Sequence, residues 1–270
     1  MLTTFRSRNP FEYPGGRLPG FDPTHPAAAG MFPGLGGSVI AVSSDTMVNL
    51  LTGAPLVRNG VPTTSIISAI GSGLFCNLSG QFASMSGMKV ITPTGFTWGS
   101  IIQFASISGT QSMIGIGTSD IFVVNGGSLA GFLNNAFITS TITLSANVPY
   151  FLAAGTRTGV CYFVATNLAT GAIRSNSVST ATTPVALSGS ANFGNGYGSG
   201  QPCRGYMAAA MYSTVFPSMA TLLAWAADPW SFWYPPEVEQ LIDFSLSSPP
   251  PPPPPFTTSY RYVQNIIQNQ

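Results

Sequence analysis

The run FTWGSIIQFAS, residues 96–106, indicates the fold class because it is short, uncharged and built largely from residues that favour strands. Runs of the same kind recur along the body of the chain at Ser112–Ile116, Ile121–Val124, Ala136–Leu144, Pro149–Ala154, Val160–Thr166, Val185–Leu187 and Gly205–Val215. Turn residues such as Asn125-Gly126-Gly127 and Thr170-Gly171 lie between them, at a spacing of roughly 8–15 residues. The pattern predicts an all-β fold, an antiparallel two-sheet sandwich or jelly roll.

One helix is expected, over Pro217–Ala227. Pro217 suits the first helical position, Asp228-Pro229 ends the helix, and Leu222, Leu223, Trp225 and Ala226 offer an apolar face. The uncharged segment 205–227 is also long enough to span a bilayer. We instead interpret this segment as a strand, a turn and a short helix, because five residues interrupt its apolar run: Ser213, Thr214, Pro217, Ser218 and Thr221.

Composition divides the chain into three zones. Residues 1–30 form an N-terminal arm rich in Pro and Gly, and residues 31–234 form the sandwich. Residues 235–270 form a tail with a short acidic patch, Pro249–Pro255 and the terminal sequence FTTSYRYVQNIIQNQ. The proline run favours polyproline II, so the tail is expected to act as a semi-rigid spacer that ends in an anchor.

Charged residues make up only 6% of the chain, against about 25% in ordinary soluble domains, and the formal net charge is +1. There is no basic field to hold nucleic acid, and the six charges between positions 46 and 227 are scattered. A surface with so few charged residues does little to prevent association, which favours a protein that is part of an assembly. The three cysteines, Cys76, Cys161 and Cys203, are expected to be buried thiols, because their spacing indicates neither a zinc site nor a disulfide framework.

Catalytic groups are scarce. Asp120 is the only acid between Thr46 and Ala227, so a pair of carboxylates for glycoside cleavage cannot form within the sandwich. The remaining candidates, Glu237, Glu239 and Asp243, follow the sandwich, and the single histidine, His25, lies in the N-terminal arm. We therefore expect that the chain is not an enzyme and that it has no catalytic residues, no metal ligands and no cofactor.

A family resemblance starts at residue 204. The segment from residue 204 resembles the closing segment of laminin-G-like, concanavalin-A-like lectin and glucanase domains. The features that match its pattern are Gly205, Tyr212, the expected helix and Asp228-Pro229-Trp230. The opening sequence GFDPTHP, residues 20–26, resembles the lead-in of such domains in tailed-bacteriophage proteins. Unlike that family, the chain has no Ser-x-x-Glu capping box at the helix. The resemblance implies a two-sheet sandwich and leaves function open, because this fold carries lectins, hydrolases and structural modules.

Low charge and the phage-like opening together predict a non-enzymatic structural protein on the exterior of a bacteriophage particle. It would be a capsid decoration or fibre-associated protein, homo-oligomeric, and fixed by its arms to other virion proteins. The expected anchor residues are Phe256, Tyr260, Tyr262, Val263, Ile266 and Ile267. The alternative is a glycan- or receptor-binding module of a tail fibre, with contact residues Trp98, Tyr197 and Tyr206. Neither hypothesis requires nucleic acid or a membrane.

Overall fold

A computed structural model provides the structure of the chain. It describes residues 11, 13–14, 37–43, 46–60, 62–67, 69–78, 80–91, 95–116, 119–133, 136–182, 187–196, 201–230 and 232–233. All of these belong to one compact unit, Arg8–Pro236. The expected anchor residues of the tail lie outside the described residues, and so do Tyr197, His25 and the segment 20–26.

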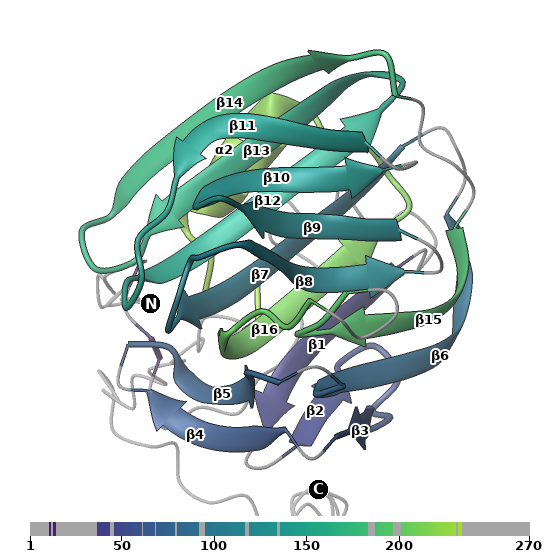
Figure 1. Ribbon diagram of the computed structural model, residues 1–270, viewed down its shortest axis with the longest axis vertical. Coiled ribbons are helices and arrows are strands. Elements are labelled where there is room, and N and C mark those ends of the chain that lie inside the picture. The colour runs from purple at the N-terminus through teal and green to yellow at the C-terminus, as the bar shows by residue number, and fades with distance from the viewer. Residues whose placement is uncertain are drawn as a thin grey trace, which may run out of the picture. The chain divides into compact units, whose positions relative to one another are not determined.

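The described strands form two antiparallel sheets, which confirms the predicted β-sandwich (Figure 1). Sheet A has nine strands, seven of them in the order β14-β13-β12-β7-β16-β1-β2, while β5 pairs with β16 and β4 pairs with β5. Its strands are β1 (Gly37–Ser43), β2 (Thr46–Asn49), β4 (Thr63–Ile67), β5 (Gly71–Cys76), β7 (Phe96–Phe104), β12 (Pro149–Arg157), β13 (Gly159–Asn167), β14 (Ala172–Thr180) and β16 (Gly205–Ser213).

Sheet B has seven strands in the order β11-β10-β9-β8-β15-β6-β3. They are β3 (Val57–Asn59), β6 (Phe82–Ile91), β8 (Thr110–Ile116), β9 (Ser119–Asn125), β10 (Ser128–Leu133), β11 (Ala136–Thr143) and β15 (Leu187–Phe193). At one side of the sandwich, β11 of sheet B lies beside β14 of sheet A, and the backbone N–H of Thr141 donates to Oδ1 of Asn176 at 3.2 Å (Figure 1).

Strand β16 is shared along one edge by two partners. Gly205–Met207 pair with Cys76–Leu74 of β5, whereas Ala209–Ser213 pair with Ala41–Gly37 of β1. The change of partner coincides with a shift of register against β7 between Met207 and Ala209. An extra residue of this kind bends a strand and lets its edge serve two neighbours.

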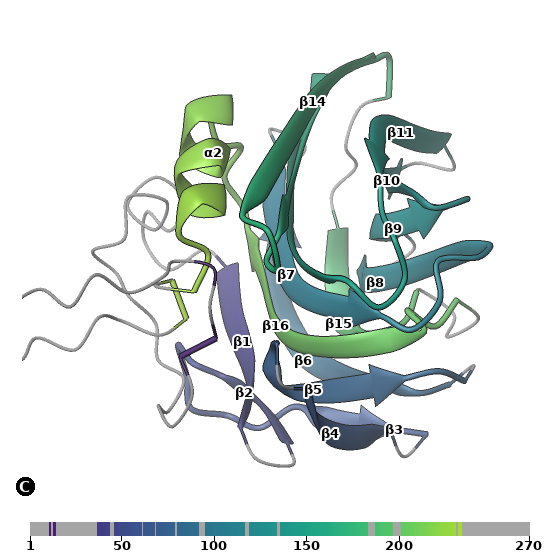
Figure 2. The same cartoon turned by 90° about the vertical axis from the view of Figure 1, so that its left-hand side faces the viewer.

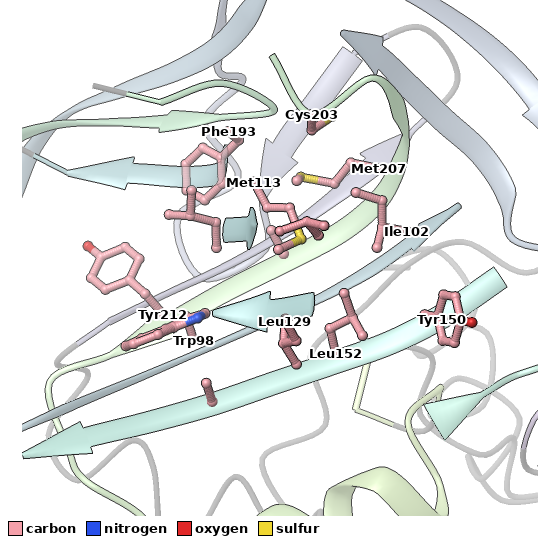
Figure 3. Packing of buried hydrophobic residues seen from close by; sticks show 14 of the residues in the cluster. Trp98, Ile102, Met113, Leu129, Tyr150, Leu152, Phe193, Cys203, Met207 and Tyr212 are labelled. Atoms are coloured by element: carbon pink, nitrogen blue, oxygen red, sulfur yellow. The ribbon is translucent and has the colours of Figure 1, made fainter. Parts of the chain in front are cut away.

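The main core fills the space between the sheets. Trp98, Leu152 and Met207 come from sheet A, and Met113 and Leu129 come from sheet B, all fully buried (Figure 3). Burial of apolar area on this scale is the dominant favourable contribution to the stability of such a domain. Figure 3 also shows Tyr150 at one end of this cluster.

A third layer covers the outer face of sheet A (Figure 2). It contains helix α2 (Met219–Ala227) and the aromatic residues Trp230, Phe232 and Trp233, which are fully buried. The helix approaches closely at Gly99, where an added Cβ would lie 2.2 Å from the Trp225 ring. Glycine at this position therefore lets the helix dock.

Part of the N-terminal arm belongs to the same layer. The Trp230 indole N–H donates to the carbonyl oxygen of Phe11 at 3.2 Å, and the rings of Tyr13 and Trp230 meet edge to face with their centroids 5.2 Å apart. Residues of the N-terminal arm and of the segment after α2 are thus joined on one face of sheet A.

The sequence-based helix prediction is wrong at its start. The helix begins at Met219, and Ser218 is the N-cap, with its hydroxyl accepting from the Thr221 N–H at 3.0 Å. Pro217 therefore precedes the cap. No helix among the described residues is long and apolar enough to cross a membrane, and segment 205–227 divides into β16, a turn and α2.

Candidate functional site

Two of the residues proposed for glycan contact, Trp98 and Tyr206, lie on opposite faces of sheet A. Trp98 on β7 is fully buried between the sheets, with its ring 5.0 Å from that of Phe96, so it offers no surface to a ligand. Tyr206 on β16 is half-buried and stacks on Phe75, with centroids 4.5 Å apart. Tyr197 lies outside the described residues, and glycan contact through Tyr206 stays a prediction.

A cleft of about 280 Å³ opens where the edge strands of the two sheets meet. It lies among β11 on one side and β12, β13 and β14 on the other. Its apolar lining comes from Ile142, Tyr150, Ala165 and Ala172. Its polar lining comes from Thr143, Asn167, Thr170 and Arg174. An apolar surface with a few polar groups is the usual make-up of a small-molecule site.

Local turn geometry positions the polar side of this cleft. Asn167 ends β13, and its Oδ1 accepts from the backbone N–H groups of Ala169 and Thr170, at 3.0 and 3.3 Å. Such an Asx turn fixes the side chain and leaves its amide nitrogen as a donor. Gly171 then closes the turn with φ of 74°, and β14 starts at Ala172.

The lining of the cleft offers groups suited to binding. None of its lining residues is Asp, Glu, His or Cys. Among the described residues there is also no group of three or more His, Cys, Asp or Glu side chains that could hold a metal ion. The cleft can hold a small polar ligand. It offers an apolar contact surface, hydrogen bonds from hydroxyl and amide groups, and one guanidinium.

All three cysteines are buried, as predicted, and they are free thiols. The Cys203 thiol lies 3.8 Å from the carbonyl oxygen of Cys76 and 3.6 Å from that of Gly205. Contact with Cys203 and burial raise the pKa of the Cys76 thiol far above its usual range. Burial likewise raises the pKa of Cys161 from 9.0 to about 12, with Thr156 acting in the opposite direction. Cys76 and Cys161 therefore stay protonated at neutral pH, which makes them poor nucleophiles.

No sequence pattern marks the cleft residues as a site. Arg174 is one of the six scattered charges between positions 46 and 227. Its distinguishing signal was its place three residues after the Thr170-Gly171 turn, in a segment otherwise rich in Ser and Thr.

The chain matches no protein-family model, and no curated protein resembles it in sequence. Solved structures with a related fold include the enzymatically active domain of tailspike protein 2 of bacteriophage CBA120. That match has a TM-score of 0.47 and 20% identity, and covers 63% of this chain and 30% of the tailspike chain.

Two further solved structures come from other sources. Trypanosoma rangeli sialidase in complex with sialic acid matches with a TM-score of 0.47 and 11% identity, over 73% of this chain and 34% of the sialidase. Domain 4 of an extracellular arabinanase from Geobacillus stearothermophilus, in complex with arabinotriose, matches with a TM-score of 0.45 and 9% identity, over 72% of this chain and 87% of that domain. The chain thus spans about a third of the length of the tailspike and sialidase chains.

These comparisons correct one prediction. The expectation that the chain is not an enzyme is wrong, because the structures it resembles include an enzymatically active tailspike domain and sialidases. The physical reason is that a scarcity of acids in one segment of a chain does not exclude activity for a fold that carries hydrolases elsewhere. At these identities no reaction, substrate or catalytic residue is carried over to this chain. The link to bacteriophage proteins is supported in part, whereas the laminin-G-like and concanavalin-A-like resemblance stays a prediction.

Proposed function

We propose that this chain is an exterior component of a bacteriophage particle, associated with the tail or its fibres, that assembles with further copies through one edge of its sandwich. The terminal arms, with the anchor residues of the tail, would attach it to other virion proteins. The alternative within this proposal is a capsid decoration protein, which would be associated with the head instead of the tail.

The observation that carries the proposal is a set of three exposed apolar side chains in segment 57–78, at the margins of both sheets. Val57 on β3, Ile66 on β4 and Leu78 after β5 are exposed by 65%, 85% and 60%, more than any other large apolar side chain of the described residues. β3 ends sheet B, and β4 lies at the margin of sheet A beside β5. Apolar side chains on edge strands favour pairing with another chain unless charges or prolines block it. Arg58 is the only charged residue in the segment, and its one proline, Pro62, precedes β4 and does not lie within a strand.

The bacteriophage setting rests on two further points. The opening segment 20–26 resembles the lead-in of tailed-bacteriophage proteins. The tailspike likeness agrees with such a setting but is weak, so the support for assembly comes from the surface of this chain.

Self-association of the full chain tests the proposal. We expect light scattering after size exclusion to give an oligomer for the native chain and a monomer for Ile66→Lys. Leu223→Lys is the matched control, because Leu223 is also an exposed apolar residue, at 36%, but lies on α2. A monomeric native chain at high concentration would contradict the proposed edge contact.

Attachment is tested separately with phage particles that lack this protein. We expect the native chain to bind them and a variant with Tyr260→Ser, Tyr262→Ser and Ile266→Ser to lose binding. Equal binding by both chains would show that the tail residues are not the anchor. Binding to heads without tails would favour the capsid decoration alternative.

A second function, contact with a host-surface glycan, is favoured by the cleft between β11 and β14. It has a size near the lower end for small-molecule pockets and combines apolar, hydroxyl and amide groups. A glycan array probed with the full chain tests this function without reference to assembly.

A further inference from the structure

The cleft exists because the inner face of sheet A carries fewer large apolar residues towards the turn between β13 and β14. Residues directly opposite each other in adjacent antiparallel strands share one face of the sheet. Arg174 of β14 pairs with Ala165 of β13, and Ala165 pairs with Leu152 of β12. Because Ala165 and Leu152 belong to the core between the sheets, Arg174 projects from the same inner face.

The neighbouring row has the same orientation. Tyr150, Asn167 and Ala172 are paired across β12, β13 and β14. Further along β14, the inner-face positions are Asn176, which accepts a hydrogen bond from β11, and Val178, which packs on the core. Where other sandwich positions carry large apolar residues, Ala165, Ala172 and Arg174 leave the space between the sheets unfilled and open to solvent.

A guanidinium at the mouth of such an opening attracts an anion. No acidic side chain lines the cleft. Arg174 is the only charged residue of the lining. The Arg174 guanidinium is exposed, so it can meet a ligand, and an arginine binds a carboxylate through two parallel hydrogen bonds, which a neutral hydroxyl cannot provide.

The other lining groups suit the hydroxyls of a sugar ring. Thr143 and Thr170 are exposed, and the Asn167 amide nitrogen is available as a donor because its oxygen is engaged in the turn. Ile142, Ala165 and the buried ring of Tyr150 supply an apolar floor. A volume of about 280 Å³ fits a ligand of one or two rings.

We propose that this cleft binds a sugar acid, a saccharide unit that carries a carboxylate, with Arg174 as the carboxylate-binding residue. The inference deepens the glycan-contact function above and rests on it, but it is independent of assembly through the 57–78 edge. Specificity comes from the charge pair, while Asn167, Thr143 and Thr170 contact ring hydroxyls.

Glucuronate and glucose are the probes, because they differ only in the carboxylate that Arg174 would bind. Titrations of the full chain are followed by changes in NMR chemical shift at low ionic strength. We expect glucuronate to bind at least about tenfold more tightly than glucose, the ratio that one charge-assisted hydrogen-bond pair provides. Arg174→Gln removes that ratio. Arg157→Gln, the same change at an exposed arginine that ends β12, leaves the ratio unchanged.

A second variant separates charge from shape. Ala172→Leu fills the cleft without altering charge, so it weakens both sugars in equal measure. Because Ala172 and Arg174 are exposed, thermal unfolding of both variants is expected to match that of the native chain.

The outcomes distinguish this inference from the function on which it rests. If both sugars bind equally and Arg174→Gln changes neither, the sugar-acid assignment is wrong and the glycan function stands. If Arg157→Gln abolishes the preference as well, binding is a general charge effect and the site assignment is overturned. If neither sugar binds while a glycan array is positive, the glycan site lies elsewhere; a blank array overturns the glycan function too.

Discussion

Replacing Trp225 by alanine tests whether the third layer is an integral part of the fold. The side chain is fully buried, and its ring contacts those of Phe151, Phe232 and Trp233 at centroid distances of 4.6, 4.8 and 5.5 Å. Truncating a buried tryptophan costs about 3–5 kcal/mol, from lost transfer free energy and the cavity left behind. We therefore expect Trp225→Ala to lower the free energy of unfolding by that amount.

A graded pair of variants sharpens the test. The Trp225 indole N–H is buried and has no hydrogen-bond partner among the described residues, so Trp225→Phe removes an unsatisfied donor along with part of the ring. The relief offsets part of the packing loss, and we expect a cost well below that of alanine. Leu223→Ala, on the exposed side of the same helix, should cost under about 1 kcal/mol.

Urea unfolding followed by far-UV circular dichroism measures all three, with equal m values required for the comparison. The reasoning fails if Leu223→Ala destabilises as much as Trp225→Ala, because the helix would then not be docked through its Trp225 face. It also fails if the phenylalanine variant is as unstable as the alanine variant.

Ser218→Ala removes the helix N-cap and should cost about 1 kcal/mol in thermal or urea unfolding, whereas Ser218→Asp should cost little; equal losses would refute the capping role. The raised pKa of Cys161 means that its unfolded thiol ionises from pH 9.0 while the folded thiol does not, so stability falls as pH rises from 9.0 to about 12. Cys161→Ala should flatten the slope of unfolding free energy against pH by up to about 1.4 kcal/mol per pH unit, and an unchanged slope would contradict the assignment. Gly194→Ala should destabilise the fold, because its φ is 87° and the new Cβ would lie 2.4 Å from the Cys76 sulfur; Cys76→Ala should restore part of the loss, and no rescue would show that backbone strain alone is responsible.

The strands that the sequence predicted are those whose residues are themselves strong strand formers. β7, β12, β13 and β16 carry long runs of Ile, Val, Phe, Tyr and small residues, and each was located to within a few residues. β14 was missed because AIRSNSVST has little apolar alternation. Pairing with β13 along the whole of Gly159–Asn167 holds it in the sheet, and that tertiary contact leaves no mark on its own sequence.

The candidate site was harder to predict for a similar reason. Its lining combines β11 of one sheet with β12, β13 and β14 of the other, and only the register places Arg174 opposite Ala165. A shift of one residue would turn Arg174 to the outer face. Aromatic residues such as Trp98 drew attention instead, although an aromatic residue on a central strand is usually part of the core.

The bond between Trp230 and Phe11 has a mechanical consequence. Phe11 and Trp230 stand at opposite ends of the described part of the chain, yet they are joined within the aromatic layer on sheet A. A force that pulled these two residues apart would act on this layer first. The hydrogen-bonded ladder of sheet B would carry none of that force directly.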